Sequence, residues 1–438
     1  MTVKLGVIAD DFTGATDIAG FMVQNGWKVV QLLNEPDENT VIPQGVDAIV
    51  VSLKSRSCPV DEAVNASVNA CNWLKKKAQC QQIFFKYCST FDSTEKGNIG
   101  PVTDALMKQL GTTLALVCPA LPVNGRTVVH GHLFVNGQLL NESGMQHHPV
   151  TPMTDANLLR VMEKQSKGKA GLIKLADIQQ GSEAVKSQLT ELAQQGVNYA
   201  IVDTLTMDDL LPIAQAVKTM PLLTGGSGLG AALANIDSQC AWGENSARGE
   251  KPTGTTRKTV ILSGSCSVMT NKQVQAYQKV APAKALDVGE CLANPEYAKL
   301  LATWVQEQQG GGLAPLLYAT QPPELLKKTQ EKYGAAESSA AVENVFGEVV
   351  KLLQSQGYDT FIIAGGETSG KVVQSLGTEQ LSIGSPIAPG VPWVQDLASG
   401  SWLALKSGNF GQENFFQFAQ EMFNEWWKGA APRTSRLG

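Results

Sequence analysis

Short runs of apolar and β-branched residues recur along the chain, and a stretch with helical spacing of its apolar residues follows most of them. The runs are continuous rather than alternating between apolar and polar, which indicates strands that are buried on both faces. In the first half they lie at 4–9, 47–53, 82–87, 113–120, 171–176, 199–204 and 221–234. Strands of this kind belong to a mostly parallel sheet that helices cover, so we predict an α/β fold.

The length of 438 residues is too great for one ordinary core, so two or three domains are expected. Apolar periodicity is lost in 241–257, which contains Gly, Pro, Ser and Thr and is typical of a linker. We therefore predict an N-terminal domain at 1–240, this linker, a C-terminal domain at 258–428 and a patternless tail at 429–438. Each domain is expected to have a mostly parallel sheet with helices on both faces, with the active site in the interdomain cleft.

Charge and cysteine content exclude several classes of protein. The net charge of −5 and the lack of a long basic run argue against a nucleic-acid-binding surface. No apolar run approaches the roughly 18 residues that span a bilayer, so no membrane contact is predicted. The N-terminal apolar stretch is too short for a signal peptide, and an acidic pair follows it, which favours a cytoplasmic location. The eight Cys form no C-x-x-C pair and are expected to be free thiols.

The segment 125–150 differs from its surroundings, because the turn signals NG and ESG separate short alternating runs. This pattern predicts a β-hairpin. All four His residues lie in the segment, at positions 130, 132, 147 and 148. Since no Cys stands at ligand spacing and no clear carboxylate partner is present, we predict no protein metal site there.

Ligands of open α/β sheets bind beyond the carboxyl ends of the strands, and polar residues gather at such a position early in the chain. Asp10 and Asp11 end the first predicted strand, and Thr13 and Gly14 lead into the next helix. Free N–H groups and the dipole at a helix start favour an anion. One Asp or Thr would suffice to cap the helix. Two adjacent carboxylates and a Gly-bearing turn exceed that need, so a binding site is predicted.

Two further strand ends carry polar residues. Arg56 follows the second strand, and Arg can grip a carboxylate with two parallel hydrogen bonds, although alone it is more often a surface charge. The segment 86–100 is dense in polar side chains, among them Lys86, Asp92, Ser93 and Asn98. Polar loops usually face solvent. Because this one follows a buried strand and ends at a helix start, a polyol-binding loop is at least as good an interpretation.

Three turns rich in glycine and serine follow strands in the second half, at 263–267, 365–370 and 406–411. Each alone is a weak signal, but together they indicate one long polyphosphate ligand that several loops contact. The motif GGETSGKV at 365–372 is close to a P-loop. Val372 lacks the hydroxyl that a P-loop uses for Mg²⁺, and the motif stands near the end of the chain. We therefore reject a P-loop and keep a phosphate-binding turn.

Long motifs in a fixed order resemble those of the four-carbon acid sugar kinase family. They are GVIADDFTGATD, FKYCSTFDSTEKGNIGPVTDAL, PALPVNGRT, LSGSCS, AGGETSGKV, APGVPW and LALKSGNFG. The resemblance implies an acid-sugar-binding N-terminal domain and a nucleotide-binding C-terminal domain. It also implies an ATP-dependent phosphotransferase that uses Mg²⁺ and phosphorylates the 4-hydroxyl of a four-carbon acid sugar. The similarity is greatest to members that act on 3-oxo-tetronate, and the related threonate or erythronate is the alternative substrate.

The resemblance assigns the nucleotide contacts, whereas the substrate-binding and catalytic roles are hypotheses from the residue types at the strand ends. The family's nucleotide contacts map onto seven of the eight predicted nucleotide-binding residues, and Ser265 is added from its own turn; the full set is Ser263, Ser265, Gly365, Gly366, Glu367, Thr368, Gly408 and Gly411. The predicted substrate-binding residues are Thr13, Arg56, Lys86, Ser93 and Asn98. Arg56, with Lys86, is expected to pair with the substrate carboxylate. Among the predicted catalytic residues, Asp10, Asp11 and Asp92, one would accept the proton of the 4-hydroxyl.

Two other functions stay open at this point. A non-catalytic acid-sugar sensor with nucleotide as effector predicts binding without turnover. An ATP-dependent ligase would release AMP or place phosphate on the carboxylate, and it requires a second nucleophile. The Asp-rich strand end favours a kinase, because a binding protein needs no proton acceptor there. Trp426 and Trp427 are expected to serve packing or an interface, so a homodimer is included among the expected partners.

Overall fold

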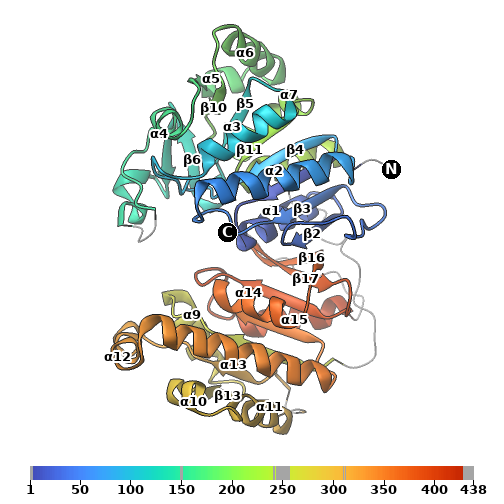
Figure 1. Cartoon of the computed structure of the whole chain (residues 1–438), viewed down its shortest axis with the longest axis vertical. Helices are drawn as coiled ribbons and strands as arrows, with labels where there is room; N and C mark the ends of the chain where they lie inside the picture. The colour runs from blue at the N-terminus through green and yellow to red at the C-terminus, as the bar shows by residue number, and fades with distance from the viewer. Residues whose placement is uncertain are drawn as a thin grey trace. The chain divides into compact units, whose positions relative to one another are not determined.

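A computed structural model of the chain describes residues 3–147, 151–239, 242, 257–308, 310 and 312–427 (Figure 1). The chain divides into two compact units, Met1–Asn245 and Ser246–Gly438. The predicted linker lies outside the described residues except for Trp242 and Arg257, and the predicted tail lies outside them entirely.

The N-terminal unit contains a parallel sheet with the strand order β2-β3-β1-β4-β11-β5-β10-β9. Its strands are β1 (Leu5–Ala9), β2 (Val29–Leu33), β3 (Ala48–Ser52), β4 (Gln82–Lys86), β5 (Ala115–Cys118), β9 (Ala170–Ile173), β10 (Tyr199–Val202) and β11 (Leu222–Gly225). The residues of β1, β3 and β4 are buried throughout, as the continuous apolar runs predict. The strand β2 is an addition to the predicted set.

Helices cover both faces of this sheet. On one face Ile8 and Ile83 pack in a core with α2 (Val60–Lys76), α3 (Ile99–Leu110) and α4 (Leu158–Gln165). A second group of helices is joined by mutual contacts: α8 (Ser227–Ser238) contacts α1 (Phe12–Gln24) and α7 (Leu210–Val217), and α7 contacts α6 (Ser182–Gln194). The short α5 (Leu175–Ile178) contacts α6. The predicted fold class of this half is confirmed.

A small antiparallel sheet stands apart from the parallel one. It consists of β6 (Arg126–Val129), β7 (His132–Val135) and β8 (Gln138–Leu139), with 3₁₀ turns η1 (Pro122–Asn124), η2 (Leu140–Glu142) and η3 (Gly144–His147) around it. Asn136 and Gly137 form the β7–β8 turn with φ values of 51° and 81°, so the NG signal is confirmed. Among the described residues, no cluster of three His, Cys, Asp or Glu side chains could hold a metal. His148 lies outside those residues.

The C-terminal unit has the strand order β13-β14-β12-β15-β18-β17-β16. Its strands are β12 (Thr259–Ser263), β13 (Ala283–Ala285), β14 (Leu316–Tyr318), β15 (Thr360–Ala364), β16 (Gln380–Ala388), β17 (Val391–Asp396) and β18 (Trp402–Lys406). The strands β13, β14, β12, β15 and β18, neighbours in this order, pair in parallel. The strand β17 is antiparallel to both β16 and β18. The sheet is therefore mostly parallel, as predicted, with an antiparallel hairpin that the sequence analysis did not anticipate.

Helices also cover both faces of this second sheet. On one face Ile261 and Ile362 pack with α9 (Val268–Tyr277) and α15 (Phe415–Trp427). The long helix α13 (Ala335–Ser355) is at the centre of the remaining helices. It contacts α10 (Val288–Ala293), α11 (Tyr297–Glu307), α12 (Pro323–Tyr333) and α14 (Gly366–Ser375). Trp426 is buried beside Trp402, which confirms its predicted role in packing.

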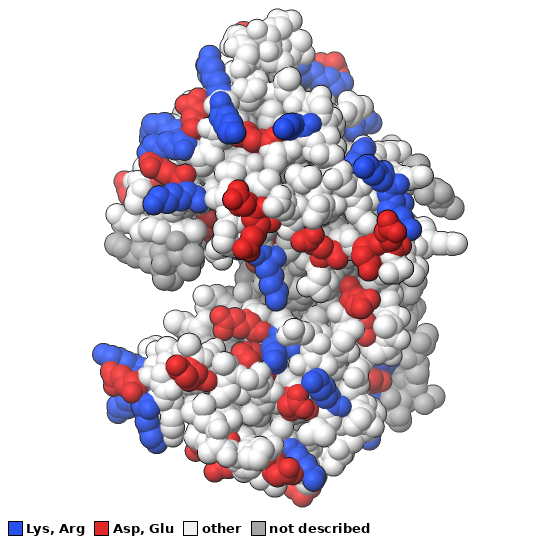
Figure 2. Space-filling model, viewed as in Figure 1, with Lys and Arg blue, Asp and Glu red and all other residues white. Residues whose placement is uncertain are grey.

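The surface charges and the helices relate to two classes of protein that the sequence argues against, nucleic-acid-binding and membrane proteins. On the face drawn in Figure 2, Lys and Arg are interspersed with Asp and Glu, and no extended basic patch is visible. Over the part of the chain that the structure describes, no helix combines the length and apolar character needed to cross a membrane.

Candidate active site

The polar residues predicted at the strand ends of the N-terminal unit lie together at one edge of its sheet. Asp10 follows β1, Arg56 follows β3 and Lys86 ends β4, and these three strands are neighbours. The Asp10 backbone N–H donates to the Lys86 carbonyl at 3.0 Å, and the Arg56 N–H donates to the Asp10 carbonyl at 3.1 Å. Parallel pairing therefore brings residues from distant parts of the sequence to one site.

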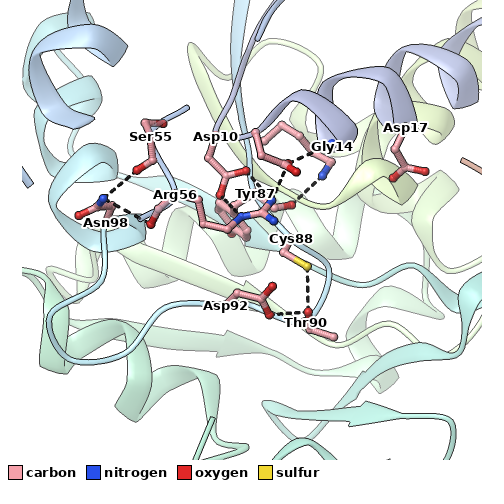
Figure 3. A network of polar contacts seen from close by, with 12 residues as sticks. Asp10, Gly14, Asp17, Ser55, Arg56, Tyr87, Cys88, Thr90, Asp92 and Asn98 are labelled. Atoms are coloured by element: carbon pink, nitrogen blue, oxygen red, sulfur yellow. Dashed lines mark hydrogen bonds and ion pairs between the residues drawn. The ribbon is translucent and has the colours of Figure 1, made fainter. Parts of the chain in front are cut away.

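An ion-pair network joins Arg56 to two carboxylates (Figure 3). Arg56 Nε and Nη2 donate to the two Asp10 oxygens at 3.0 and 2.8 Å, and Nη2 also donates to Asp11 Oδ1 at 2.6 Å. Asp10 is 4% exposed, and burial raises the pKa of its carboxyl against the opposing effect of Arg56. The Nη1 protons of Arg56 have no acceptor among the described residues. The guanidinium can therefore still bind a ligand carboxylate.

The start of α1 approaches Lys86 closely. Asp11 is the N-cap of α1, and its Oδ1 accepts from the Gly14 N–H at 3.0 Å. A side chain at Gly14 would meet both the Asp11 carboxylate and the Lys86 Nζ, so these two groups would have to move to make room for it. Lys86 is buried, and its Nζ donates to the Tyr87 carbonyl at 2.8 Å. Thr13 lies in the first turn of α1 and is partly exposed.

Asp17 is an acidic residue at this site that the sequence analysis missed. It follows Gly14 by three positions on α1, so both lie on one helix face (Figure 3). The Ser227 hydroxyl donates to Asp17 Oδ2, whereas the buried Oδ1 has no hydrogen-bond partner among the described residues. Burial raises the pKa of the Asp17 carboxyl, and Lys86 opposes this shift. Its spacing from Gly14 could have indicated that it lies at the site, but an isolated Asp in a predicted helix is usually interpreted as a surface residue.

The loop after β4 divides into residues that face the site and residues that support it. Asp92 Oδ1 accepts from the Thr90 hydroxyl at 2.5 Å. Ser93 is buried and donates to Gln165 Oε1 at 2.6 Å. The Asn98 amide donates to the Ser55 carbonyl at 2.7 Å, on the loop that carries Arg56. The side-chain contacts of Ser93 and Asn98 are thus with the protein, and they fix the surrounding loops.

The three glycine-rich turns of the C-terminal unit follow the neighbouring strands β12, β15 and β18. The Ser265 N–H donates to the Ala364 carbonyl at 3.1 Å, and the Gly365 N–H donates to the Lys406 carbonyl at 2.8 Å. Gly365 has φ 132°, a conformation that L side chains rarely adopt. At Gly408 an added Cβ would lie 2.7 Å from Ser265 Oγ. The structure thus brings the predicted turns together, with backbone packed against backbone.

A cavity of about 330 Å³ opens at these turns. Five predicted nucleotide-binding residues line it: Ser265, Gly365, Gly366, Glu367 and Thr368. Val288, Leu326 and Val342 form an apolar part of its wall. A volume of this size and a mixed polar and apolar lining are typical of small-molecule sites.

The other predicted nucleotide residues lie beside the cavity. The Ser263 hydroxyl is buried and bonds with Thr320 Oγ1 at 2.7 Å. Gly411 has φ 77° and packs so closely on Phe415 that an added Cβ would lie 2.6 Å from its ring. Gly408 packs against Ser265 rather than lining the cavity.

Glu343 is a lining residue that the sequence analysis missed, because it lies inside the long helix α13 with no local motif. Its Oε1 accepts from the Thr368 hydroxyl at 2.9 Å. Burial raises the pKa of Glu343 to about 7, and the neighbouring Glu367 adds to the shift. Val372 is fully buried in α14, which agrees with a packing residue rather than the metal-binding position of a P-loop.

Taken by their own geometry, the two units define a class of protein. One α/β unit holds an ion-pair network with cations at its strand ends, and the other holds a cavity of small-molecule size at a helix start. The sequence matches the family model of a sugar-binding N-terminal domain over residues 5–233 and that of a nucleotide-binding C-terminal domain over residues 260–416. The chain belongs to the four-carbon acid sugar kinase family, as its motifs predict.

Full-length relatives support this placement. The 3-oxo-tetronate kinase of Brucella melitensis biotype 1 is 53% identical over 423 residues, covering 96% of each chain. That of Pectobacterium atrosepticum is 54% identical over 427 residues, covering 96% of this chain and 99% of the relative. A solved Haemophilus influenzae structure, 51% identical, has a TM-score of 0.85 and covers 95% of this chain and 100% of that chain. A Salmonella typhimurium LT2 structure, 49% identical, has a TM-score of 0.89, with coverages of 95% and 98%.

Proposed function

We propose that this protein is an ATP-dependent kinase that transfers the γ-phosphoryl group to the 4-hydroxyl of 3-oxo-tetronate, giving the 4-phosphate. The observation that carries the proposal is the identity of 53% and 54% to two 3-oxo-tetronate kinases across 96% of this chain. The lining residues of both sites support it, because one site offers cations for an acid and the other offers a helix start for phosphate. A cytoplasmic location would provide ATP.

The acid sugar is proposed to bind at the strand ends of the N-terminal unit. Arg56, through its Nη1 protons, and Lys86 would pair with the substrate carboxylate. Asp10 and Asp11 hold Arg56 in position and keep it charged. Thr13 and the free N–H groups of α1 would contact the substrate oxygens. Ser93 and Asn98 act through the loops that they support.

The proton acceptor is proposed to be Asp17 or Asp92. Arg56 already donates to both Asp10 oxygens and to Asp11 Oδ1, so these oxygens are occupied by the guanidinium. Asp17 keeps one oxygen without a partner among the described residues, and burial raises its pKa. A carboxylate with a raised pKa is a stronger base and is more suited to accept the hydroxyl proton.

MgATP is proposed to bind as the phosphoryl donor in the cavity of the C-terminal unit. The exposed start of α14 at Gly366, the Ser265 turn and the absence of side chains at the glycines suit a polyphosphate. Val288, Leu326 and Val342 suit the apolar faces of the base. Glu343 and Glu367 border the same cavity and offer the oxygen ligands that Mg²⁺ takes together with phosphates. When bound, Mg²⁺ would neutralise charge on the transferring phosphoryl group.

A substrate panel tests the proposed function. ADP formation should be measured with 3-oxo-tetronate, threonate and erythronate, and 3-oxo-tetronate should give the highest kcat/KM. A higher value with threonate or erythronate would move the proposal to that acid. Binding of acid and nucleotide without turnover would favour the sensor, and AMP release or an acyl phosphate product would favour the ligase.

A further inference from the structure

Lys406 is a buried charged residue that the proposed reaction does not use. It ends β18, and its side chain is fully shielded from solvent. Its Nζ lies 3.1 Å from Thr270 Oγ1, 3.1 Å from the Ser407 carbonyl and 2.8 Å from the Gly408 carbonyl. The lysine thus ties the glycine loop 407–411 to α9.

All three partners of the Lys406 amine are acceptors. The Thr270 hydroxyl donates its own proton to the Gly408 carbonyl at 2.7 Å, so its oxygen can only accept from Lys406. Three acceptors require three N–H donors, which only the charged ammonium form provides. A neutral amine would leave one acceptor without a donor. Protonation of Lys406 would therefore satisfy all three acceptors.

The environment of Lys406 opposes that charge. Among the described residues it makes no ion pair, and burial is the sole cause that lowers its pKa, to about 7. The charged residues on the elements around it are Lys272 on α9, Glu367 and Lys371 on α14, Asp396 on β17, and Glu421 and Glu425 on α15. None of them supplies a counter-charge that offsets burial. The ammonium form would therefore be fully hydrogen-bonded and would lie 5.8 Å from the centroid of the Phe415 ring, but it has no ionised partner among the described residues.

The position of Lys406 relative to the cavity indicates where a counter-charge could come from. The Lys406 carbonyl accepts from the N–H of Gly365, the N-cap of α14. Gly408, whose carbonyl it holds, packs on Ser265, which lines the cavity. An anion at the start of α14 would therefore lie near the 407–411 loop, which the Lys406 amine contacts.

We propose that the nucleotide polyphosphate supplies the missing counter-charge, so that Lys406 takes up a proton on nucleotide binding and fixes the 407–411 loop against Ser265. Lys406 is thus a positioning residue, and the proposal rests on the proposed nucleotide site. Because the complex favours the protonated form, nucleotide affinity should fall as pH rises above about 7, by up to tenfold per pH unit.

Calorimetric titration of the full-length protein with ADP and Mg²⁺ tests this coupling. Titrations at about pH 8 in buffers of different ionisation enthalpy give the number of protons taken up. At that pH ADP itself is fully ionised, and a lysine of pKa about 7 is mostly neutral, so uptake should approach about 0.9 proton per ADP. Glu343, with its pKa also about 7, is the competing source.

Three variants assign the proton. Lys406→Met should abolish uptake and remove the fall in ADP affinity above pH 7. Glu343→Gln should retain the proton uptake per bound ADP, even where the loss of a proposed Mg²⁺ ligand changes the ADP affinity itself. Lys351→Met, an exposed lysine on α13, controls for the loss of one positive charge. If Lys406→Met does not fold, uptake that persists in Glu343→Gln supports Lys406. ADP binding without proton uptake, or uptake that only Glu343→Gln removes, overturns the Lys406 proposal alone. Failure of ADP to bind at all also overturns the proposed nucleotide site.

Discussion

At the scale of single residues, the Arg56 guanidinium joins the two carboxylates of the proposed acid site. Two of its nitrogens are committed to Asp10 and Asp11, so the geometry depends on the planar, forked shape of the group rather than on its charge alone. A lysine could keep the charge, but it could not bridge both carboxylates and still present free donors.

Arg56→Lys should therefore raise KM for the acid sugar by about 10-fold or more, which corresponds to the loss of about 1.4 kcal/mol or more of binding. ADP affinity should stay unchanged, because the nucleotide cavity has other lining residues. Steady-state kinetics and ADP calorimetry measure the two effects. An unchanged KM would show that Arg56 has a structural role only.

Asp17 gives a second residue-scale prediction. Asp17→Asn should lower kcat by about 10²- to 10⁴-fold with little change in KM, if it accepts the hydroxyl proton. In the wild-type enzyme kcat should fall as pH drops through its raised pKa, because the base must be ionised. Ser227→Ala is the matched control, since it removes only the hydrogen bond to Asp17. If Asp92→Asn rather than Asp17→Asn shows the loss, Asp92 is the base.

The raised pKa of Glu343 predicts how the free energy of unfolding depends on pH. Its folded-state pKa of about 7 exceeds the ordinary value of 4.5, so its charge disfavours folding increasingly as pH rises between these values. Because the side chain is partly exposed, the effect is taken as about 1–2 kcal/mol. Glu343→Gln should raise the free energy of unfolding by that amount at pH 8, and by far less at pH 5. Urea denaturation measures it, with Glu348→Gln, at an exposed position on the same helix, as control. An equal effect of Glu343→Gln at both pH values would contradict the shift.

At the scale of helices and strands, the sequence predicts where the site lies better than what each residue contacts. The rule that parallel strands present their carboxyl ends at one edge places Asp10, Arg56 and Lys86 together correctly. It cannot predict Asp17 or Glu343, because their partners, Ser227 and Thr368, come from other parts of the chain. The rule also does not distinguish a residue such as Asn98, whose amide supports a loop, from a residue that contacts a ligand.

The unexpected strands have a physical explanation too. The hairpin of β16 and β17 contains prolines at 386 and 392 and glycines at 384 and 390, residues that ordinarily interrupt strands. Register shifts between the two strands accommodate Pro386. A continuous apolar run was therefore not visible, although the folded hairpin is largely buried.

Two glycines of the nucleotide turns give a matched prediction at this scale. Gly408→Ala would bring a Cβ to 2.7 Å from Ser265 Oγ, so the turns must separate and ADP affinity should fall by about tenfold. Gly370→Ala meets no atom within 4 Å and should leave ADP affinity unchanged, while the helix gains up to about 1 kcal/mol. Calorimetry and thermal denaturation measure both. Equal ADP affinities in the two variants would contradict the packing argument.

At the scale of the whole molecule, the proposed function places a separate site in each unit, and both proposed ligands are anions. The net charge of −5 opposes such ligands, so local cations and helix starts must attract them. In the proposed acid site these groups would be Arg56, Lys86 and the start of α1. In the proposed nucleotide site they would be the start of α14 and Lys406. Membership of the acid sugar kinase family links the two sites in one reaction.

The most direct test of the central claim is the structure of the product. The full-length protein should be incubated with MgATP and 3-oxo-tetronate, and the products examined by ³¹P and ¹³C nuclear magnetic resonance. We predict ADP together with a phosphate monoester whose phosphorus couples to C4 of the acid. Phosphate on the carboxylate, release of AMP, or no phosphorylated acid at all would contradict the proposed kinase.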